Sequence, residues 1–360
     1  MKAAVCREFG APLQIEEVAL SEPGEGEVEV KLSACAICHS DITYADGGWG
    51  GHLPAVYGHE AAGIVTATGP GKSRFKPGLR VLVTLIRSCG HCPNCATGVP
   101  TSCENATGQS RLRSEDGEYI WAAMECGAFA ESVIVHNSQL VALPDDIPLE
   151  VASLLSCGVI TGVGAVVNTA AMKPGAMVAV IGAGGVGLNT IQGAAIAGAS
   201  RIIALDLTAE KLETAKAFGA TDGVIASDAD ARKQVRKLTG GRGADHVFVT
   251  VGAPPAYKSA APMLAKNGSL VIVGMPPSGV EIPYDPTVFA AQNQKILGSK
   301  MGQTVLARDI PWLIDLWRQG RLKLDELIAS RFPLEEINEA IANTKAGTTG
   351  RNVILFDEAV

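Results

Sequence analysis

Four cysteines close together in the sequence form the clearest metal-binding pattern of this chain. Cys89, Cys92, Cys95 and Cys103 follow the spacing C-x2-C-x2-C-x7-C. Thiolates at this spacing can converge on one tetrahedral Zn²⁺, which accepts soft sulfur ligands in closed structural sites. The pattern therefore predicts a structural zinc site. The alternatives are a reduced, cysteine-rich loop or, if the protein is exported, a cluster of disulfides.

A glycine-rich segment gives a second pattern, one that is typical of dinucleotide binding. Gly182, Gly184 and Gly187 form G-x-G-x-x-G, with Gly185 and Val186 inside the motif. The segment follows a predicted strand directly and opens a predicted helix, so the helix N-terminus would face a pyrophosphate. The bland alternative is a helix start whose glycines serve packing alone.

An acidic residue ends the strand that follows this motif. Asp206 lies nineteen residues after Gly187, where a carboxylate would accept hydrogen bonds from the ribose hydroxyls of a coenzyme. A 2′-phosphate would meet the negative charge of Asp206, and the next residues, Leu207 and Thr208, supply no arginine. The sequence therefore favours NAD over NADP.

Two kinds of predicted elements must position these residues. The first 155 or so residues contain short β segments between glycine and proline turns, which predicts a mostly antiparallel β domain. Segments after residue 158 alternate between apolar strands and helices, which predicts βαβ units and a doubly wound parallel sheet. The predicted strands are 27–33, 61–69, 79–83, 130–136, 177–182, 201–206, 245–252, 269–274 and 295–300, and the predicted helix after the glycines is 185–198. The last 60 or so residues are predicted to be turn-rich and to end in a strand at 352–356 that pairs back onto the first domain.

The composition narrows the class of protein. A chain of 360 residues predicts two domains, and 47% hydrophobic with 19% charged residues is ordinary for a globular protein. A net charge of −7 argues against a nucleic-acid partner, which would select for a basic surface. No secretory h-region and no membrane-length apolar run occur in the sequence. We therefore expect a cytoplasmic protein without a membrane partner, whose nine cysteines stay reduced.

Three further residues suggest a second metal site, although their spacing cannot assemble it. Cys38, His59 and Cys157 are far apart in the sequence. Taken singly, each residue fits a buried structural role better than the role of a metal ligand.

Together with the other motifs, these residues resemble the zinc-dependent alcohol dehydrogenases of the medium-chain dehydrogenase/reductase superfamily. The segment Gly58-His59-Glu60-Ala61-Ala62-Gly63 is similar to the zinc signature of that family, and the four cysteines are similar to its structural zinc loop. The resemblance covers nearly the whole chain. It implies a GroES-like catalytic domain at 1–158 and 300–360, with the structural zinc lobe at about 87–105, and an NAD-binding Rossmann domain at 159–299.

The resemblance also assigns roles to individual residues. It implies two Zn²⁺ per subunit, one of them bound by Cys38, His59 and Cys157, the ligand set known for alcohol dehydrogenase. Asp41 would hold the His59 ring, and Glu60 would lie close behind the metal. The coenzyme contacts that it implies, besides the glycine motif and Asp206, are His39, Thr161, Val186, Lys211 and Arg351.

The implied reaction is a reversible hydride transfer between a primary alcohol and NAD⁺ that gives the aldehyde. Ser40 would take the alcohol proton, but Thr43 stands where many relatives carry the next histidine of the proton relay. Trp49 and Leu85 match positions that line the substrate pocket, which favours an apolar or aromatic tail. The substrate would be a small alcohol or aldehyde, and the assembly a homodimer or homotetramer.

Other functions remain open at this point. One alternative is a thiol-dependent formaldehyde dehydrogenase that acts on an S-hydroxymethyl adduct, and another is a secondary alcohol or polyol dehydrogenase. A third is a non-catalytic nucleotide-binding protein, although such proteins commonly lose the catalytic zinc ligands. The charged loop 106–125 has no predicted contacts, and one interpretation is a solvated surface loop.

Overall fold

The computed structural model describes residues 1–347 and 349–356. Its contacts divide the chain into two compact units. Unit 1 contains Met1–Cys157, Val305–Trp317 and the segment from Leu324 onward, and unit 2 contains Gly158–Thr304 and Arg318–Lys323. Unit 2 is therefore inserted in the sequence of unit 1.

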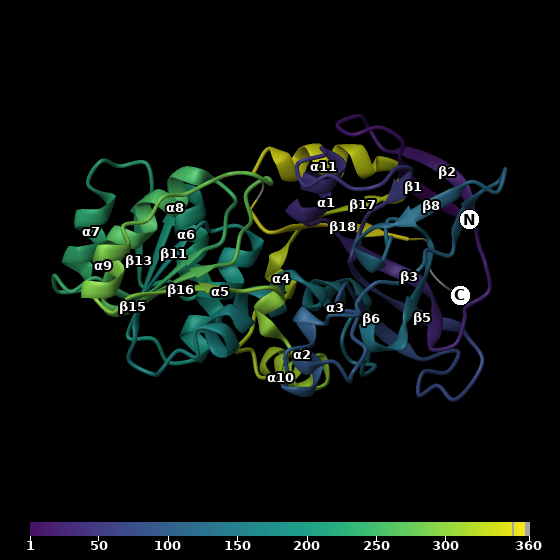
Figure 1. Cartoon of the computed structure of the whole chain (residues 1–360), viewed down its shortest axis with the longest axis horizontal. Helices are drawn as coiled ribbons and strands as arrows, with labels where there is room; N and C mark the ends of the chain where they lie inside the picture. Colours follow the sequence, from purple (N-terminus) through teal and green to yellow (C-terminus); the bar gives the residue numbers. More distant parts are fainter. Residues whose placement is uncertain (348, 357–360) are drawn as a thin grey trace. The chain divides into compact units, whose positions relative to one another are not determined.

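Unit 1 is built on β structure that is mostly antiparallel, as predicted (Figure 1). A closed barrel is formed, in order, by β1 (Lys2–Cys6), β2 (Gln14–Leu20), β7 (Leu112–Ser114), β8 (Tyr119–Ala122) and β4 (Ala55–Val56). A second sheet has the order β10 (Leu140–Ala142), β6 (Arg80–Thr84), β5 (Glu60–Thr68), β3 (Glu27–Ala36), β18 (Arg351–Leu355) and β17 (Ile328–Pro333), and β9 (Ser132–His136) also pairs with β3.

The centre of this second sheet is tightly packed. At Gly63, a Cβ atom would lie 2.1 Å from the carbonyl oxygen of Lys31 on β3, so only glycine allows β5 to approach so closely. Buried apolar side chains, among them Leu32, Val65 and Phe129, form the core of this unit.

Helices and short turns connect the strands of unit 1. The helices are α1 (His39–Ala45), α2 (Pro93–Ala96), α3 (Leu149–Ser153), α10 (Leu306–Arg318, whose last residue belongs to unit 2) and α11 (Ile337–Lys345). The short helices are η1 (Pro100–Ser102), η2 (Ala123–Glu125), η3 (Asn137–Gln139), η4 (Leu154–Ser156), η8 (Asp325–Leu327) and η9 (Leu334–Glu336).

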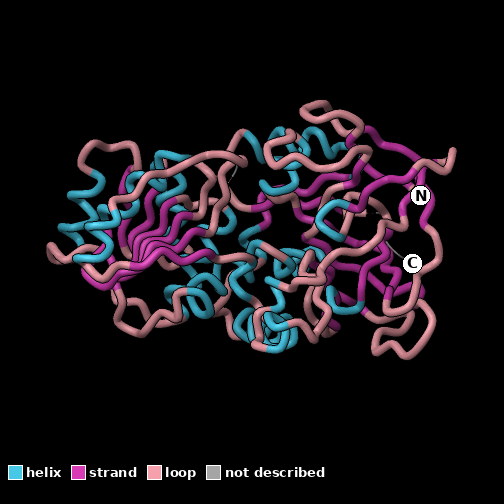
Figure 2. Tube along the Cα trace, viewed as in Figure 1, coloured by secondary structure: helices cyan, strands magenta, loops and turns pink. Residues whose placement is uncertain are grey.

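Unit 2 contains the predicted parallel sheet, flanked by helices (Figure 2). The strand order is β13 (Asp222–Ile225), β12 (Arg201–Asp206), β11 (Met177–Ile181), β14 (Ala244–Val249), β15 (Leu264–Ile272) and β16 (Lys295–Gly298), and all neighbouring strands are parallel. The helices are α4 (Gly158–Gly164), α5 (Gly185–Ile196), α6 (Ala209–Ala217), α7 (Ala231–Leu238), α8 (Pro254–Ala260) and α9 (Pro286–Ala291), with the shorter η5 (Ala165–Thr169), η6 (Ala261–Met263) and η7 (Met301–Gln303). The central strands are buried on both faces, which explains their continuous apolar sequences.

Two segments differ from what the sequence suggested. The C-terminal part contains α10 and α11 as well as turns, because Ile310, Leu313 and Ile314 bury one helical face although Pro311 interrupts the sequence pattern. The charged loop 106–125 is not simply solvated, since it contains β7 and β8, which help to close the barrel. Arg111 from this loop also forms an ion pair with Glu27, with 2.8 Å between Nε and Oε2.

Among the described residues, no single helix has both the length and the apolar character needed to cross a membrane. One bent pair of helices, Leu149–Ser156 with Gly158–Thr169, meets the criteria of length and composition when its two members are taken together.

Candidate active site and metal centres

Four potential metal ligands from separate parts of the sequence meet inside unit 1. Cys38 immediately precedes α1, His59 precedes β5, Glu60 begins β5 and Cys157 follows η4. One ligand atom from each lies within 4.8 Å of those of the other three, and all four residues are buried. We call this set the buried metal group. It contains the three ligands that the resemblance implied, with Glu60 beside them.

Asp41 organises this group through three hydrogen bonds. Its Oδ2 accepts from the backbone N–H of Cys38 at 2.9 Å, and its Oδ1 accepts from the N–H of Gly58 at 2.9 Å. The same Oδ1 lies 2.9 Å from Nδ1 of His59. Asp41 therefore fixes the backbone beside two of the ligands and orients the imidazole ring.

The imidazole of His59 fits a metal site. Its Nε2 is buried and has no hydrogen-bond partner in the part of the chain that the structure describes, while Nδ1 contacts Asp41. With the proton on Nδ1, Nε2 presents its lone pair to the neighbouring thiols, the usual arrangement of a histidine that binds zinc. An unpaired buried nitrogen is otherwise costly, so its position supports a cation at this point.

The two thiols of the group differ in their pKa values. A hydrogen bond between them lowers the pKa of Cys38 well below its usual value and raises that of Cys157 well above it. One thiolate is thus stabilised by the other thiol. Ionising both in a buried place requires a compensating positive charge, which a divalent cation would supply.

Glu60 is paired with a residue almost 300 positions later in the sequence. Nη2 of Arg351 lies 3.0 Å from Oε1 of Glu60, although the geometry is that of an ion pair and not of a hydrogen bond. Burial raises the pKa of Glu60 against the opposing effect of the guanidinium. Arg351, which the resemblance placed at the coenzyme pyrophosphate, thus lies buried beside the metal group.

The four cysteines of the lobe also converge. The ligand atoms of Cys89, Cys92, Cys95 and Cys103 all lie within 4.8 Å of one another. The sulfurs of Cys92 and Cys103 are 3.9 Å apart. This distance is much longer than a disulfide bond. It is close to the separation of about 3.8 Å expected between two thiolates bound to one tetrahedral zinc. The arrangement therefore fits a zinc ion better than a disulfide cluster.

Backbone N–H groups in this lobe donate hydrogen bonds that stabilise thiolates. The N–H of Cys92 donates to Sγ of Cys89, and the N–H of Cys89 donates to Sγ of Cys103, both at 3.3 Å. Backbone hydrogen bonds, that of His91 first, lower the pKa of Cys89 to about 6, whereas burial raises the pKa of Cys95 to about 12. The lobe thus contains both a preformed thiolate and a thiol that a metal must deprotonate.

The candidate coenzyme residues lie around the first turn of α5 in unit 2. Gly182 has φ +101°, and a Cβ atom on Gly187 would lie 1.8 Å from the carbonyl oxygen of Gly182, so both positions require glycine. Gly184 is the N-cap of α5, and Gly185 and Val186 begin the helix. This is the strand, turn and helix arrangement that binds a pyrophosphate.

Asp206 lies against this turn at the end of β12. Its Oδ2 accepts from the N–H of Ala183 and its Oδ1 from the N–H of Leu207, each at 2.7 Å. Two further predicted residues lie in the same unit. Lys211 is in the first turn of α6, and Thr161, on α4, donates from Oγ1 to the sulfur of Met301 at 3.7 Å.

The candidate proton-transfer and substrate residues lie on and after α1. His39 is exposed and Ser40 half-buried, directly after Cys38. Trp49 packs edge-on against Tyr44, with 4.9 Å between ring centroids. Leu85 follows β6 and is half-buried against the core of unit 1.

A hollow of about 510 Å³ in unit 1 lies elsewhere. It is lined mainly by apolar residues, including Phe75, Leu140, Leu306 and Pro311, and by Cys95 of the lobe. No residue of the buried metal group, nor Trp49 or Leu85, lines it.

Family models match both parts of the chain. A zinc-binding dehydrogenase model matches residues 185–319, and an alcohol dehydrogenase GroES-like domain model matches residues 24–145. An NDMA-dependent alcohol dehydrogenase from Amycolatopsis methanolica is 36% identical, with 98% of each chain covered. A class-3 alcohol dehydrogenase from Cereibacter sphaeroides is 33% identical, with 99% of each chain covered.

A solved structure gives the same result. The benzyl alcohol dehydrogenase of Acinetobacter calcoaceticus superposes with a TM-score of 0.92 and 30% sequence identity, with 99% of each chain covered. This chain belongs to the zinc-type alcohol dehydrogenases of the medium-chain dehydrogenase/reductase superfamily. It is thus an oxidoreductase, and the predicted pairing of a GroES-like domain with a Rossmann domain is confirmed.

Sequence reasoning missed three buried polar residues near the metal group. Thr84, Ser156 and Gln139 are fully buried and bonded to one another or to strand β5, as described below. Their residue types are common in turns and surfaces, so only the pairing of β5 with β6 could have indicated them.

The contacts of Asp41 lead to a first prediction. Replacing Asp41 with Asn should weaken metal binding at the buried group by about 10–100-fold. Three N–H donors converge on the carboxylate, and the amide would have to turn its own NH₂ group toward one of them. The measurement is competition with a chelator. Asp46→Asn, which removes an exposed ion pair with Lys345, is the control. Equal metal affinity in both variants would contradict the role of Asp41.

Proposed function

We propose that this protein is an NAD-dependent zinc alcohol dehydrogenase that oxidises primary alcohols with apolar or aromatic tails reversibly to aldehydes. The observation that carries the proposal is the buried metal group, in which Asp41 holds the ring of His59 and the His59 ligand atom lies within 4.8 Å of two thiols. The residues that would bind a catalytic zinc are thus close together in unit 1. A non-catalytic nucleotide-binding protein would have no need of such a costly buried arrangement.

The chemistry divides between the bound groups and the chain. Zinc at Cys38, His59 and Cys157 would supply Lewis-acid activation of the alcohol, and NAD⁺ would accept the hydride. The oxidation also releases the proton of the alcohol, which we assign to transfer through the hydroxyl of Ser40: this hydroxyl would accept the proton of the alcohol and pass its own proton onward. Asp41 keeps the His59 ring in one tautomer, and Arg351 offsets the charge of Glu60 in the buried surroundings.

The proton must then leave without a histidine relay. The hydroxyl of Thr43 donates to the carbonyl oxygen of His39 at 2.9 Å, which ties it to helix α1. A threonine hydroxyl does not titrate near neutral pH. We therefore infer that the proton passes from Ser40 to solvent by a route that does not depend on protonation of residue 43.

The substrate preference rests on Trp49 and Leu85. An indole and a branched aliphatic side chain favour a desolvated hydrocarbon or a stacked ring. The solved relative that acts on benzyl alcohol supports an aromatic tail. The absence of an acidic side chain at residue 49 argues against the thiol adduct of formaldehyde.

We also propose self-association into a homodimer or homotetramer. Strand β16 ends the parallel sheet, and Ile296 on it is 42% exposed. Val288 on α9 is likewise exposed. An open strand edge with apolar side chains can pair with the same edge of a second copy around a two-fold axis.

Metal analysis tests the proposed zinc sites. The purified, chelator-free protein should contain two Zn²⁺ per chain. Cys103→Ser should lose one zinc and lower the melting temperature, because that site contributes to folding. Cys157→Ser should lose the other zinc and all turnover while remaining folded. Cys6→Ala, which alters a buried cysteine outside both sites, should retain two. One zinc or none in the unmodified protein would contradict the assignment.

The coenzyme preference should depend on Asp206. Asp206→Gly combined with Leu207→Arg should shift the ratio of catalytic efficiencies toward NADP by about tenfold or more, since one repulsive charge is replaced by an attractive one. The assay is reduction of NAD⁺ and NADP⁺ side by side, with NDMA as the acceptor in a parallel series. Equal use of both coenzymes by the unmodified enzyme, or turnover with NDMA alone, would count against simple NAD dependence.

The substrate class can be tested with a chain-length series. Catalytic efficiency should rise several-fold per carbon from ethanol to medium-chain alcohols and be high for benzyl alcohol, since each methylene in an apolar pocket is worth about 1–3 kcal/mol. Trp49→Ala should flatten the series, whereas Trp121→Ala, a half-exposed control stacked on His52, should not. A flat series for the unmodified enzyme, or activity only with formaldehyde and a thiol together, would favour the alternative.

A further inference from the structure

Two buried hydroxyl groups tie Cys157 to the strands that carry the rest of the metal group. Oγ1 of Thr84 donates to the carbonyl oxygen of Ser156 at 2.6 Å. Oγ of Ser156 in turn donates to the carbonyl oxygen of Ala61 at 3.1 Å. Both hydroxyl residues are completely buried. We call Thr84 and Ser156 the hydroxyl clamp.

The sheet register places the clamp beside the metal ligands. Thr84 on β6 pairs directly with Glu60 on β5. Ala61, which accepts from Ser156, follows Glu60 and comes two residues after His59. The clamp therefore joins the residue before Cys157 to the start of β5, directly after His59.

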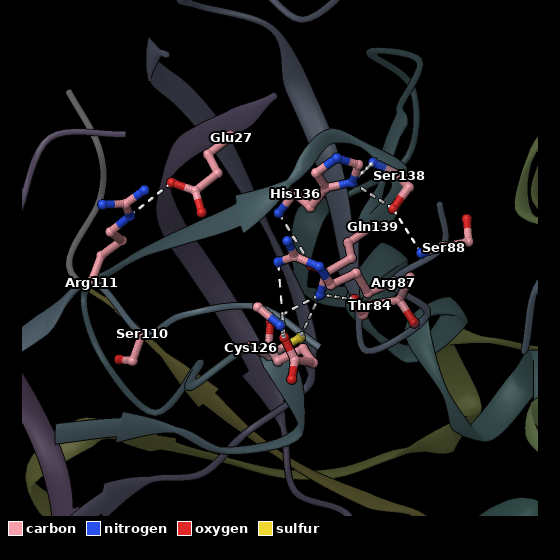
Figure 3. A network of polar contacts seen from close by, with 12 residues as sticks. Glu27, Thr84, Arg87, Ser88, Ser110, Arg111, Cys126, His136, Ser138 and Gln139 are labelled. Atoms are coloured by element: carbon pink, nitrogen blue, oxygen red, sulfur yellow. Dashed lines mark hydrogen bonds and ion pairs between the residues drawn. The ribbon is translucent and has the colours of Figure 1, made fainter. Parts of the chain in front are cut away.

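Gln139 forms a hydrogen bond with the backbone of Thr84, one of the two clamp residues (Figure 3). Its Nε2 donates to the carbonyl oxygens of Thr84 at 3.0 Å and Glu125 at 2.9 Å, and its Oε1 accepts from the N–H of His136 at 3.1 Å. Gln139 is fully buried. The backbone at Thr84 is thus fixed independently of its hydroxyl, so the hydroxyl meets Ser156 from a defined position.

The backbone of Cys157 is irregular, which is why the anchoring of the preceding residue matters. Cys157 separates η4 from α4 and has φ −146° and ψ −68°, outside both helical and strand geometry. It is also the last residue of unit 1 before the chain enters unit 2. Cys157 therefore lies between two helical segments, whereas Glu60 is part of the paired strand β5. The two hydrogen bonds of the preceding residue, Ser156, therefore help to fix the backbone from which the Cys157 sulfur extends.

The geometry assigns Thr84 and Ser156 as positioning residues that hold Cys157 in the buried metal group. This inference rests on the proposed function, because it takes the group to be a zinc site. Without the clamp, the Cys157 sulfur has a wider range of positions, and the free energy gained on binding the metal decreases. Partners of this kind that orient a metal ligand usually contribute about 10–100-fold to metal affinity.

The experiment compares single variants of the full-length, metal-loaded protein. In Thr84→Val the hydroxyl is replaced by a methyl group of similar size, Ser156→Ala removes the second hydroxyl, and Thr84→Ser restores the donor. The matched control is Thr239→Val, since Thr239 is also fully buried and donates from Oγ1 to the carbonyl oxygen of Val235, but lies in unit 2. Release of zinc to a chelator gives two metal pools, and Cys157→Ser identifies the pool of the buried group.

The expected result is an affinity for the buried zinc that is about 10–100-fold lower in Thr84→Val and Ser156→Ala, with the lobe zinc unaffected. Thr84→Ser should recover most of the loss, and Thr239→Val should show none. With Co²⁺ in the buried group, the first two variants should also shift the visible absorption bands, which report ligand geometry. If Thr84→Val does not fold, the zinc affinity and cobalt spectrum of Ser156→Ala alone test the inference.

Two other results would overturn the inference. If the variants lower only the melting temperature of the metal-free protein, with unchanged zinc affinity and cobalt spectra, the clamp is purely structural. Equal losses from both zinc pools would likewise indicate general destabilisation. If the unmodified protein binds no metal at the buried group, the proposed function fails first, and this result is distinguishable from a failure of the clamp alone.

Discussion

The carboxylate of Asp41 is the interaction on which the candidate active site depends most. It is buried, yet three N–H groups converge on it, and these hydrogen bonds stabilise its negative charge. Two of these donors belong to the backbone at Cys38 and Gly58, and the third belongs to His59. One side chain thus determines where α1 begins relative to β5 and how the imidazole is oriented. Because Asp41 is buried, losing one of these hydrogen bonds would leave an unpaired polar group, so both the position of α1 and the orientation of the imidazole are tightly constrained.

The balance of charges in the buried metal group fits a bound cation. Cys38, Cys157, Asp41 and Glu60 can all carry negative charge, and Arg351 is the basic residue that the structure pairs with this set. In a buried place, the thiols respond by sharing a proton, which separates their pKa values. A divalent cation would remove the need for that proton. In the four-cysteine lobe, negative charge on sulfur is stabilised differently, by backbone N–H groups that donate to Sγ of Cys89 and Cys103.

Much of this arrangement was predictable from local sequence. The lobe cysteines are separated by at most seven residues, and the glycine motif lies between a strand and a helix, so short-range geometry alone brings each set together. The parallel sheet followed from continuous apolar segments, and its predicted strands differ from the observed ones by a few residues at their ends. The buried metal group was different. Cys38, His59 and Cys157 were assigned from resemblance, since no spacing rule relates residues that distant.

The contacts that escaped prediction share one physical property: only the pairing of strands creates them. Glu60 meets Arg351 because β5 and β18 both pair with β3. Thr84 meets Ser156 because β6 lies next to β5. A buried threonine or serine has no sequence signature, since the same residue types are common in turns and at surfaces. In this fold the candidate coenzyme motif and the cysteine lobe are local in sequence, whereas the buried metal group depends on the least local contacts. The positions of the side chains in this group therefore have to be fixed by buried hydrogen bonds such as those of Asp41 and Thr84.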